Sequence, residues 1–132
     1  KGCNGSPVTH TVTVKPRPIL TSSLNPQDIC STESGFNFNY NPSSNIASST
    51  FNWSRSSHPS ILQLSNSGTG GVSERLTNTS IQAQTVSYIY TTSFNGCTSN
   101  QTTVQVVVKP QPKLTSTLSP NAVCSSNSSI NF

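Results

Sequence analysis

The chain repeats itself, without a gap, after 94 residues. Cys97 lies 94 residues after Cys3, and Phe132 lies 94 residues after Phe38. The runs between these residues agree closely, and the pattern Val-x-Val-Lys-Pro-x-Pro occurs at residues 12–18 and again at 106–112. A period of this length is that of a whole domain and is too long for the short stacked units of a solenoid. We therefore expect a tandem array of domains.

This period divides the chain into three parts. We expect residues 16–109 to form one complete repeat. Residues 1–15 would then be the C-terminal strand of the preceding repeat, and residues 110–132 the N-terminal part of the following one. The total length of 132 residues agrees with a single domain, for which about 100 to 200 residues are usual.

The composition excludes several classes of protein. Charged residues make up only 8% of the chain, and the formal net charge is +4. Nucleic-acid-binding proteins gather Lys and Arg on one face, whereas here they are scattered, so we expect no nucleic-acid partner. No run approaches the roughly 20 apolar residues of a membrane helix, and we expect no membrane insertion. The sequence starts without a secretion signal, as expected of a piece of a longer chain, and the uncharged polar surface predicts an extracellular, cell-surface location.

Apolar and polar residues alternate with a period of two, and turn-forming residues separate the alternating segments. In residues 35–41, for example, aromatic residues fall on one face and asparagines on the other. Strands with one buried and one solvated face are typical of an antiparallel sandwich. We predict an all-β, immunoglobulin-like antiparallel β-sandwich of about seven strands. The predicted strands are residues 18–24, 35–41, 49–55, 60–65, 72–78, 84–93 and 101–109.

The same alternation predicts the core. Trp53 alternates with Phe51, which favours a tryptophan that faces the opposite sheet over one that stacks on a sugar. The predicted core residues are Phe36, Phe38, Trp53, Tyr88, Val106 and Val108.

Two proline-rich junctions mark the ends of the complete repeat. Alternating prolines hold the backbone near the extended polyproline conformation, so a short linker of this kind acts as a semi-rigid spacer. We therefore expect successive repeats to lie end to end with limited bending. The junction residues are Lys15, Pro16, Pro18, Lys109, Pro110 and Pro112.

Four cysteines, two in each period, predict disulfide bonds and an oxidising environment, because no Cys-x-x-Cys spacing occurs and histidines are few. Three pairings respect the period. Cys30 bonds with Cys97 inside the repeat, leaving Cys3 and Cys124 for partners outside the chain. Alternatively, Cys3–Cys30 and Cys97–Cys124 bridge the linkers, or Cys30 and Cys97 bond with different neighbouring repeats. A simple sandwich layout disfavours Cys30–Cys97, since a disulfide needs Cα atoms within about 7 Å. We still rank that pair first, because one pair per domain is the simplest unit.

The sequence offers little for catalysis or metal binding. The acidic residues are Asp28, Glu33 and Glu74, and the histidines are His10 and His58. No nucleophile motif such as Gly-x-Ser-x-Gly occurs, and no cluster of carboxylates suits calcium. We expect no enzyme activity, no catalytic residue, no metal site and no cofactor.

Residues 68–71 have the sequence Gly-Thr-Gly-Gly. They lack the lysine and the strand-to-helix context of a phosphate-binding loop. We interpret them as a flexible hairpin turn between two strands.

Several runs together resemble a known family. They are Ile29-Cys30-Ser31, Gly68-Thr69-Gly70-Gly71, Leu76-Thr77-Asn78-Thr79, Gln84-Thr85-Val86-Ser87-Tyr88, Asn95-Gly96-Cys97 and residues 106–112. The chain is similar to the PKD-like, immunoglobulin-type repeats of very large Bacteroidota surface proteins, which include gliding-motility adhesins. The resemblance implies a secreted array exported by the type IX system. The acidic Gly-Asp-Gly-type loop of many PKD domains is missing, so no activity of that loop is implied.

We therefore hypothesise a structural stalk repeat of a long cell-surface adhesin or filament, which projects a distal binding region for adhesion or gliding. Its partners would be neighbouring repeats of the same chain and, through other domains, surface polysaccharide or outer-membrane machinery. The alternative is a carbohydrate-binding or adhesive module of a secreted multidomain protein. That alternative predicts an exposed aromatic platform, whereas the stalk hypothesis predicts that Tyr40, Trp53 and Tyr90 are buried.

Overall fold

A computed structural model describes residues 1–62 and 65–116 of the chain, and every regular element among them is a strand. The strands are β1 (Ile29–Cys30), β2 (Phe38–Tyr40), β3 (Thr50–Ser54), β4 (Ile61–Leu62), β5 (Ser67–Thr69), β6 (Val72–Glu74), β7 (Thr77–Asn78), β8 (Gln84–Phe94), β9 (Cys97–Thr98) and β10 (Thr102–Lys109).

The larger layer is a six-stranded sheet built around the two longest strands, β8 and β10. Its order is β1-β10-β8-β3-β5, and β9 pairs with β8. All its pairs are antiparallel except β1 with β10, which run parallel with Cys30 opposite Lys109. The valines at alternate positions of β10, Val104, Val106 and Val108, are buried, as the period-two pattern requires.

The second layer consists of two short antiparallel pairs, β2 with β6 and β4 with β7. Aromatic rings join the layers. Phe38 on β2 stacks against Tyr88 on β8 with ring centroids 5.4 Å apart, and Tyr40 meets Tyr90 at 5.5 Å. Aromatic pairs of this kind contribute about 0.5–1.5 kcal/mol beyond the area they bury. The prediction of an all-β, immunoglobulin-like sandwich is confirmed.

The prediction of a strand at residues 18–24 is wrong. Only Leu20 pairs there, in an isolated bridge to Ser44. The strand that joins the edge of the sheet, β1, begins at Ile29, because the intervening Pro26 has no N–H to donate to a ladder. The backbone of Leu24 still accepts a hydrogen bond from the N–H of Gln105 on β10 (2.8 Å).

The predicted strand 72–78 is divided into β6 and β7. Between them, the N–H and C=O of Leu76 bond with the side-chain amide of Asn37, at 2.8 and 2.9 Å, instead of with a strand. A side-chain amide of this kind replaces a backbone partner and ends the regular ladder. The predicted strand 60–65 is described only in part, since residues 63–64 lie outside the described residues.

The interpretation of residues 68–71 as a turn is wrong for the first two. Gly68 and Thr69 belong to β5, and Gly68 lies opposite Trp53 in register. A Cβ atom at Gly68 would lie 2.7 Å from the Trp53 ring, so only glycine lets the indole cover this strand. The chain turns at Gly70, where φ is +72°.

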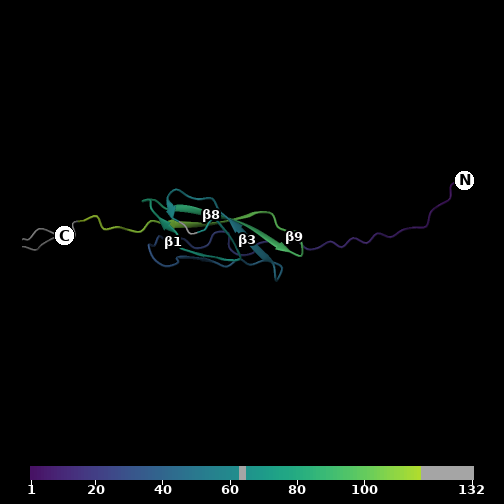
Figure 1. Cartoon of the computed structure of the whole chain (residues 1–132), viewed down its shortest axis with the longest axis horizontal. Helices are drawn as coiled ribbons and strands as arrows, with labels where there is room; N and C mark the ends of the chain where they lie inside the picture. Colours follow the sequence, from purple (N-terminus) through teal and green to yellow (C-terminus); the bar gives the residue numbers. More distant parts are fainter. Residues whose placement is uncertain (63–64, 117–132) are drawn as a thin grey trace, which may run out of the picture.

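The chain enters and leaves the sandwich at opposite ends (Figure 1). Residues 1–17 form no strand and approach the end that carries β9, which we call the entry pole. The chain leaves after β10 at the end that carries β1, which we call the exit pole. The entry and exit linkers therefore extend in opposite directions.

Candidate functional sites: the buried ion pair and the linker contacts

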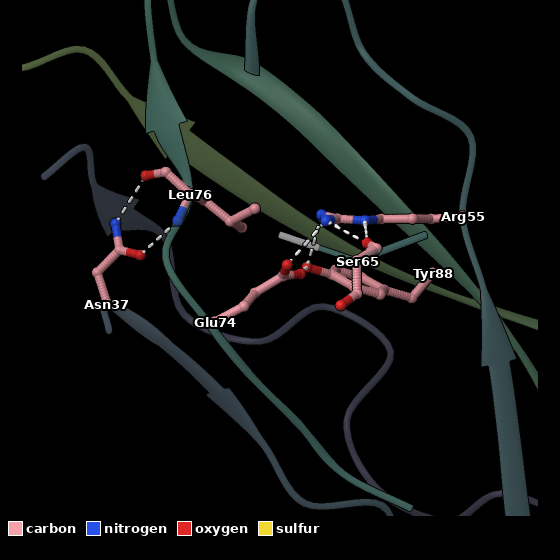
Figure 2. A network of polar contacts seen from close by, with 6 residues as sticks. All are labelled: Asn37, Arg55, Ser65, Glu74, Leu76 and Tyr88. Atoms are coloured by element: carbon pink, nitrogen blue, oxygen red, sulfur yellow. Dashed lines mark hydrogen bonds and ion pairs between the residues drawn. The ribbon is translucent and has the colours of Figure 1, made fainter. Parts of the chain in front are cut away.

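A buried ion pair connects the two layers (Figure 2). Arg55 follows β3 in the larger sheet, and Glu74 ends β6 in the smaller layer. The Nη2 atom of Arg55 lies 2.7 Å from Oε2 of Glu74, and their side chains are 0% and 4% exposed. A buried charge is tolerated only when it is paired and hydrogen-bonded, so the partners of both groups decide what the pair contributes.

Each charged group of this pair has further partners (Figure 2). Nε and Nη2 of Arg55 donate to the carbonyl of Ser65 at 2.8 and 2.6 Å, and Nη1 donates to the Tyr88 hydroxyl at 3.2 Å. The Tyr88 hydroxyl in turn donates to Oε1 of Glu74. The guanidinium also lies 5.2 Å from the centre of the Tyr88 ring, within the range of a cation–π contact.

Burial, and then the hydrogen bond with Glu74, raise the pKa of Tyr88 far above its usual value. The phenol therefore stays protonated and remains a donor to the carboxylate. Removal of any one member of this network leaves the others buried with a missing partner, which is the costly situation for a buried polar group.

This pair was not predicted, although the sequence contains a signal for it. Continuing the period of two from Phe51 and Trp53 places Arg55 on the inward face, and the same step from Val72 places Glu74 there. Two opposite charges on inward faces predict a buried pair.

Asn37 forms a second set of polar contacts, near the exit pole. Its Nδ2 atom donates to the carbonyls of Cys30 (2.8 Å) and Leu76 (2.9 Å), and its Oδ1 atom accepts from the N–H of Leu76 (2.8 Å). One side chain thereby ties β1 to the connection between β6 and β7.

The predicted core residues differ in burial. Phe38, Trp53, Tyr88, Val106 and Val108 are all buried.

Phe36 was also predicted in the core, and this is wrong, because it is 64% exposed. The strand β2 begins only at Phe38, and the chain turns just before, at Gly35, where φ is +72°. Phe36 therefore lies outside the strand, and its alternation with Phe38 has no structural meaning.

At the entry pole, the linker is held by the hairpin between β8 and β9. Lys15 Nζ donates to the carbonyl of Asn95 (3.0 Å), and Arg17 Nε donates to the carbonyl of Thr98 (2.9 Å). The hairpin turn itself is Asn95-Gly96, with φ of +46° and +83°, as a two-residue turn between antiparallel strands requires. Of the junction residues here, Pro16 is exposed and Pro18 is buried.

At the exit pole, Lys109 ends β10. Its Nζ atom lies 3.0 Å from Asp28, in an ion pair that is about half exposed, and this hydrogen bond raises the pKa of Lys109. The N–H of Ser31 donates to the Lys109 carbonyl (2.8 Å). Pro110 is then half-buried and Pro112 exposed, so the chain leaves the sheet at once.

The first-ranked disulfide, Cys30–Cys97, is not formed, and both thiols are free. Cys30 lies beside Lys109 at the exit pole, whereas Cys97 lies beside Phe94 at the entry pole. The 11 residues of β8, which connect these poles, span about 36 Å at roughly 3.3 Å per residue. A disulfide allows only about 7 Å between Cα atoms. Cys3 is a free, exposed thiol, and Cys124 lies outside the described residues.

The described residues contain no group of three or more His, Cys, Asp or Glu side chains that would hold a metal ion. Nδ1 of His58 accepts a hydrogen bond from the N–H of Ser60 (3.2 Å), which fixes the ring against its own loop, and His10 is exposed in the N-terminal segment. Within the described parts of the chain, no helix has the length and hydrophobicity needed to cross a membrane.

The aromatic rings that a sugar-binding platform would need are buried. Tyr40, Trp53 and Tyr90 are 6%, 8% and 0% exposed. They pack between the two layers and leave no ring face for a ligand to stack on.

The fold and these contacts define an immunoglobulin-like sandwich module whose polar groups hold its layers and its linkers in place. The profile of the PKD-like domain matches residues 27–112, more than half of the 132-residue chain. The chain belongs to the PKD-like domain family. No curated protein and no solved structure matches it. PKD-like domains are commonly extracellular, and they typically act as non-catalytic structural or adhesive modules.

Proposed function

We propose that this PKD-like domain is one structural repeat in the stalk of a long secreted adhesin or filament. Rigid sandwiches joined in series would project a distal binding region away from the cell. The observation that carries the proposal is the position of the linkers: the chain enters at one pole, bonded to the hairpin by Lys15 and Arg17, and leaves at the other. A domain with this geometry extends a chain instead of folding it back.

The repeated linker supports the same conclusion. Lys15 and Lys109 occupy the same position of the period, and each is followed by alternating prolines, which behave as a semi-rigid spacer. In a tandem array, Lys109 would therefore contact the hairpin of the following repeat as Lys15 contacts Asn95 here.

Small-angle X-ray scattering from a chain of three repeats tests the proposal. Each sandwich spans about 36 Å along β8, and three extended linker residues add about 9 Å. We expect a rod of roughly 130 Å for three repeats. A compact particle, or one that behaves as freely jointed beads, would contradict the proposal. A matched variant with Pro110→Gly and Pro112→Gly, repeated at the equivalent prolines, should bend more at unchanged domain stability.

The cellular setting is taken from the resemblance to repeats of giant Bacteroidota surface proteins. We propose export by the type IX system and a role in surface adhesion or gliding. Surface labelling of intact cells should detect the repeats in the parent strain and not in a strain that lacks the type IX system. Equal labelling of both strains would contradict this route of export.

A further inference from the structure

The two cysteines of the repeat lie at opposite poles, beside the two linkers. Cys30 is the register partner of Lys109, next to the exit linker. Cys97 follows the hairpin turn at the entry pole. Cys30 is exposed and Cys97 is half-buried, so neither residue is enclosed in the core.

The lysine of the repeated linker, which is Lys15 in the first copy and Lys109 in the second, lies near each of these cysteines. Lys15 Nζ bonds with the carbonyl of Asn95, and Arg17 Nε bonds with that of Thr98. These two acceptors flank Cys97 in the sequence. Lys109, which corresponds to Lys15 after one period, is adjacent to Cys30 in the sheet.

The same lysine position therefore faces Cys30 of its own repeat and the Cys97 hairpin of the repeat that follows. We propose that Cys30 of each repeat forms a disulfide with Cys97 of the next repeat, across the Lys-Pro junction. The partner is thus a second copy of this domain in the same chain. This inference rests on the tandem arrangement proposed above.

The alternative pairing Cys3–Cys30 does not agree with this geometry. Cys3 corresponds to Cys97 of the preceding repeat, and Cys97 lies at the entry pole. In a head-to-tail array, Cys3 and Cys30 would be separated by about two domain lengths, far beyond the roughly 7 Å of a disulfide.

The bond forms by thiol–disulfide exchange with a disulfide oxidant such as oxidised glutathione. One cysteine thiolate attacks the oxidant to give a mixed disulfide and releases one glutathione thiolate. The second cysteine thiolate then attacks the mixed disulfide and displaces the other. The two cysteines lose two electrons and two protons, and one oxidised glutathione becomes two reduced glutathione molecules.

The test lengthens the chain by one period, by joining residues 1–109 to residues 16–132, with Cys3→Ser and Cys124→Ser. Only Cys30 and Cys97 of each copy then remain. Trypsin does not cut the Lys-Pro and Arg-Pro bonds of the linker, so Cys97 of the first copy and Cys30 of the second stay in one middle peptide. The first Cys30 and the last Cys97 are in separate peptides on either side of it.

After oxidation with glutathione and digestion without reductant, we expect the two outer peptides to be linked to each other. Links from each outer peptide to the middle one would show pairing within a repeat and overturn the proposal. Free thiols after oxidation would also overturn it. Cys97→Ser in the second copy should abolish the outer link, and Cys97→Ser in the first copy should leave it unchanged.

Two controls separate the disulfide from the array itself. Oxidation in denaturant should lose the preference for the outer link, because the preference comes from the folded poles; an equal preference in denaturant would contradict the proposal. Scattering from the lengthened chain with all cysteines replaced by serine reports on the array alone. If the all-serine chain is extended but the chain with cysteines lacks the outer link, only the disulfide proposal is contradicted. If the all-serine chain is compact, the proposed array is contradicted as well.

Discussion

The two copies of the Val-x-Val-Lys motif have the same sequence pattern and different structures. In the first copy, Val12 and Val14 are 82% and 88% exposed and belong to no strand. In the second copy, Val106 and Val108 are 0% exposed and lie in β10. Local sequence alone therefore does not make this motif a strand. Its burial depends on the rest of the repeat, as β-propensity in general depends on packing.

The neighbours of β10 explain the difference. Val106 and Val108 are opposite Val86 and Gln84 of β8, and β1 pairs with the other edge of β10. Asn78 of β7 adds a hydrogen bond from Nδ2 to the Val108 carbonyl (2.8 Å). These partners all lie between the two copies in the sequence, and in the described residues they pair with the second copy.

The largest effect is expected from placing a charge at equivalent valines of the two copies. Val108→Asp places an unpaired charge in the core, which costs far more than the stability of a small domain usually allows, and we expect the repeat to be unfolded. Val14→Asp is the matched control at the first copy, and we expect a change within about 0.5 kcal/mol, as for other exposed sites. Urea unfolding followed by circular dichroism measures both. A similar loss for the two variants would show that the first copy is packed in solution.

The next effect concerns the ion pair that joins the layers around β8. Arg55→Ala should lower the free energy of unfolding by about 3–5 kcal/mol, because it leaves Glu74 buried without its charge partner. The double variant Arg55→Met, Glu74→Leu should be more stable than Arg55→Ala, since neither charge remains. Chemical denaturation of the three proteins measures this. A loss under about 1 kcal/mol for Arg55→Ala would mean that the pair is solvated.

A titration at high pH sharpens the comparison, because all three tyrosines lie in the complete repeat and none in the first copy. Burial is the main cause that raises the pKa of Tyr40, Tyr88 and Tyr90 above 10. The unfolded chain ionises near pH 10, whereas Tyr88 and Tyr90 of the folded chain stay protonated above that pH, so stability is complete below pH 10 and falls above it. Each of these two tyrosines contributes a loss of about 1.4 kcal/mol per pH unit between its unfolded and its folded pKa.

Tyrosinate absorbance should therefore appear together with the loss of circular dichroism, in one steep transition. Tyr90→Phe should make stability fall less steeply with pH, because one ionising group is gone. Absorbance that rises near pH 10 while the fold persists would contradict the burial of these rings.

The smallest effect is expected at the linker lysines themselves. Lys109→Ala removes a half-exposed ion pair with Asp28, and Lys15→Ala removes an exposed bond to Asn95. Neither substitution should change the free energy of unfolding measurably, because solvent-exposed ion pairs and hydrogen bonds contribute little. Lys15→Ala should instead make residues 1–17 easier to cut by protease. A clear loss of stability at either lysine would mean that the linker contributes to the core.

The sequence predicted the long strands and most of the core, because alternation in β8 and β10 is regular and uninterrupted. The prediction was wrong where local features interrupt the regular backbone hydrogen bonding between strands. Asn37 divides the predicted strand 72–78, and the turn at Gly35 leaves Phe36 outside β2. Neither effect has a periodic signal. Gly68 was predicted to lie in a turn. Its close approach to Trp53 depends on the register between β3 and β5, which the local sequence does not reveal.

The site residues could be predicted where the signal is in the sequence itself. The linker residues were predicted from the two copies of the Val-x-Val-Lys-Pro motif, since a repeated motif can be recognised without a structure. The buried pair Arg55–Glu74 was within reach of the alternation pattern. The predicted strand order already placed Cys30 and Cys97 at opposite ends of the sandwich. The pair was nevertheless ranked first, because one disulfide per domain is the simplest unit.

The parallel pairing of β1 with β10 has a consequence for a chain under tension. The first segment of the repeat runs from the entry pole toward the exit pole, and β10 runs the same way. If the two ends are pulled apart, these neighbours slide past each other, so the bonds between them, including Ser31 N–H to Lys109 and Gln105 N–H to Leu24, are loaded together in shear and do not open one after another. Resistance to such a load is set by the rate of unfolding, and this arrangement makes the unfolding step a collective one.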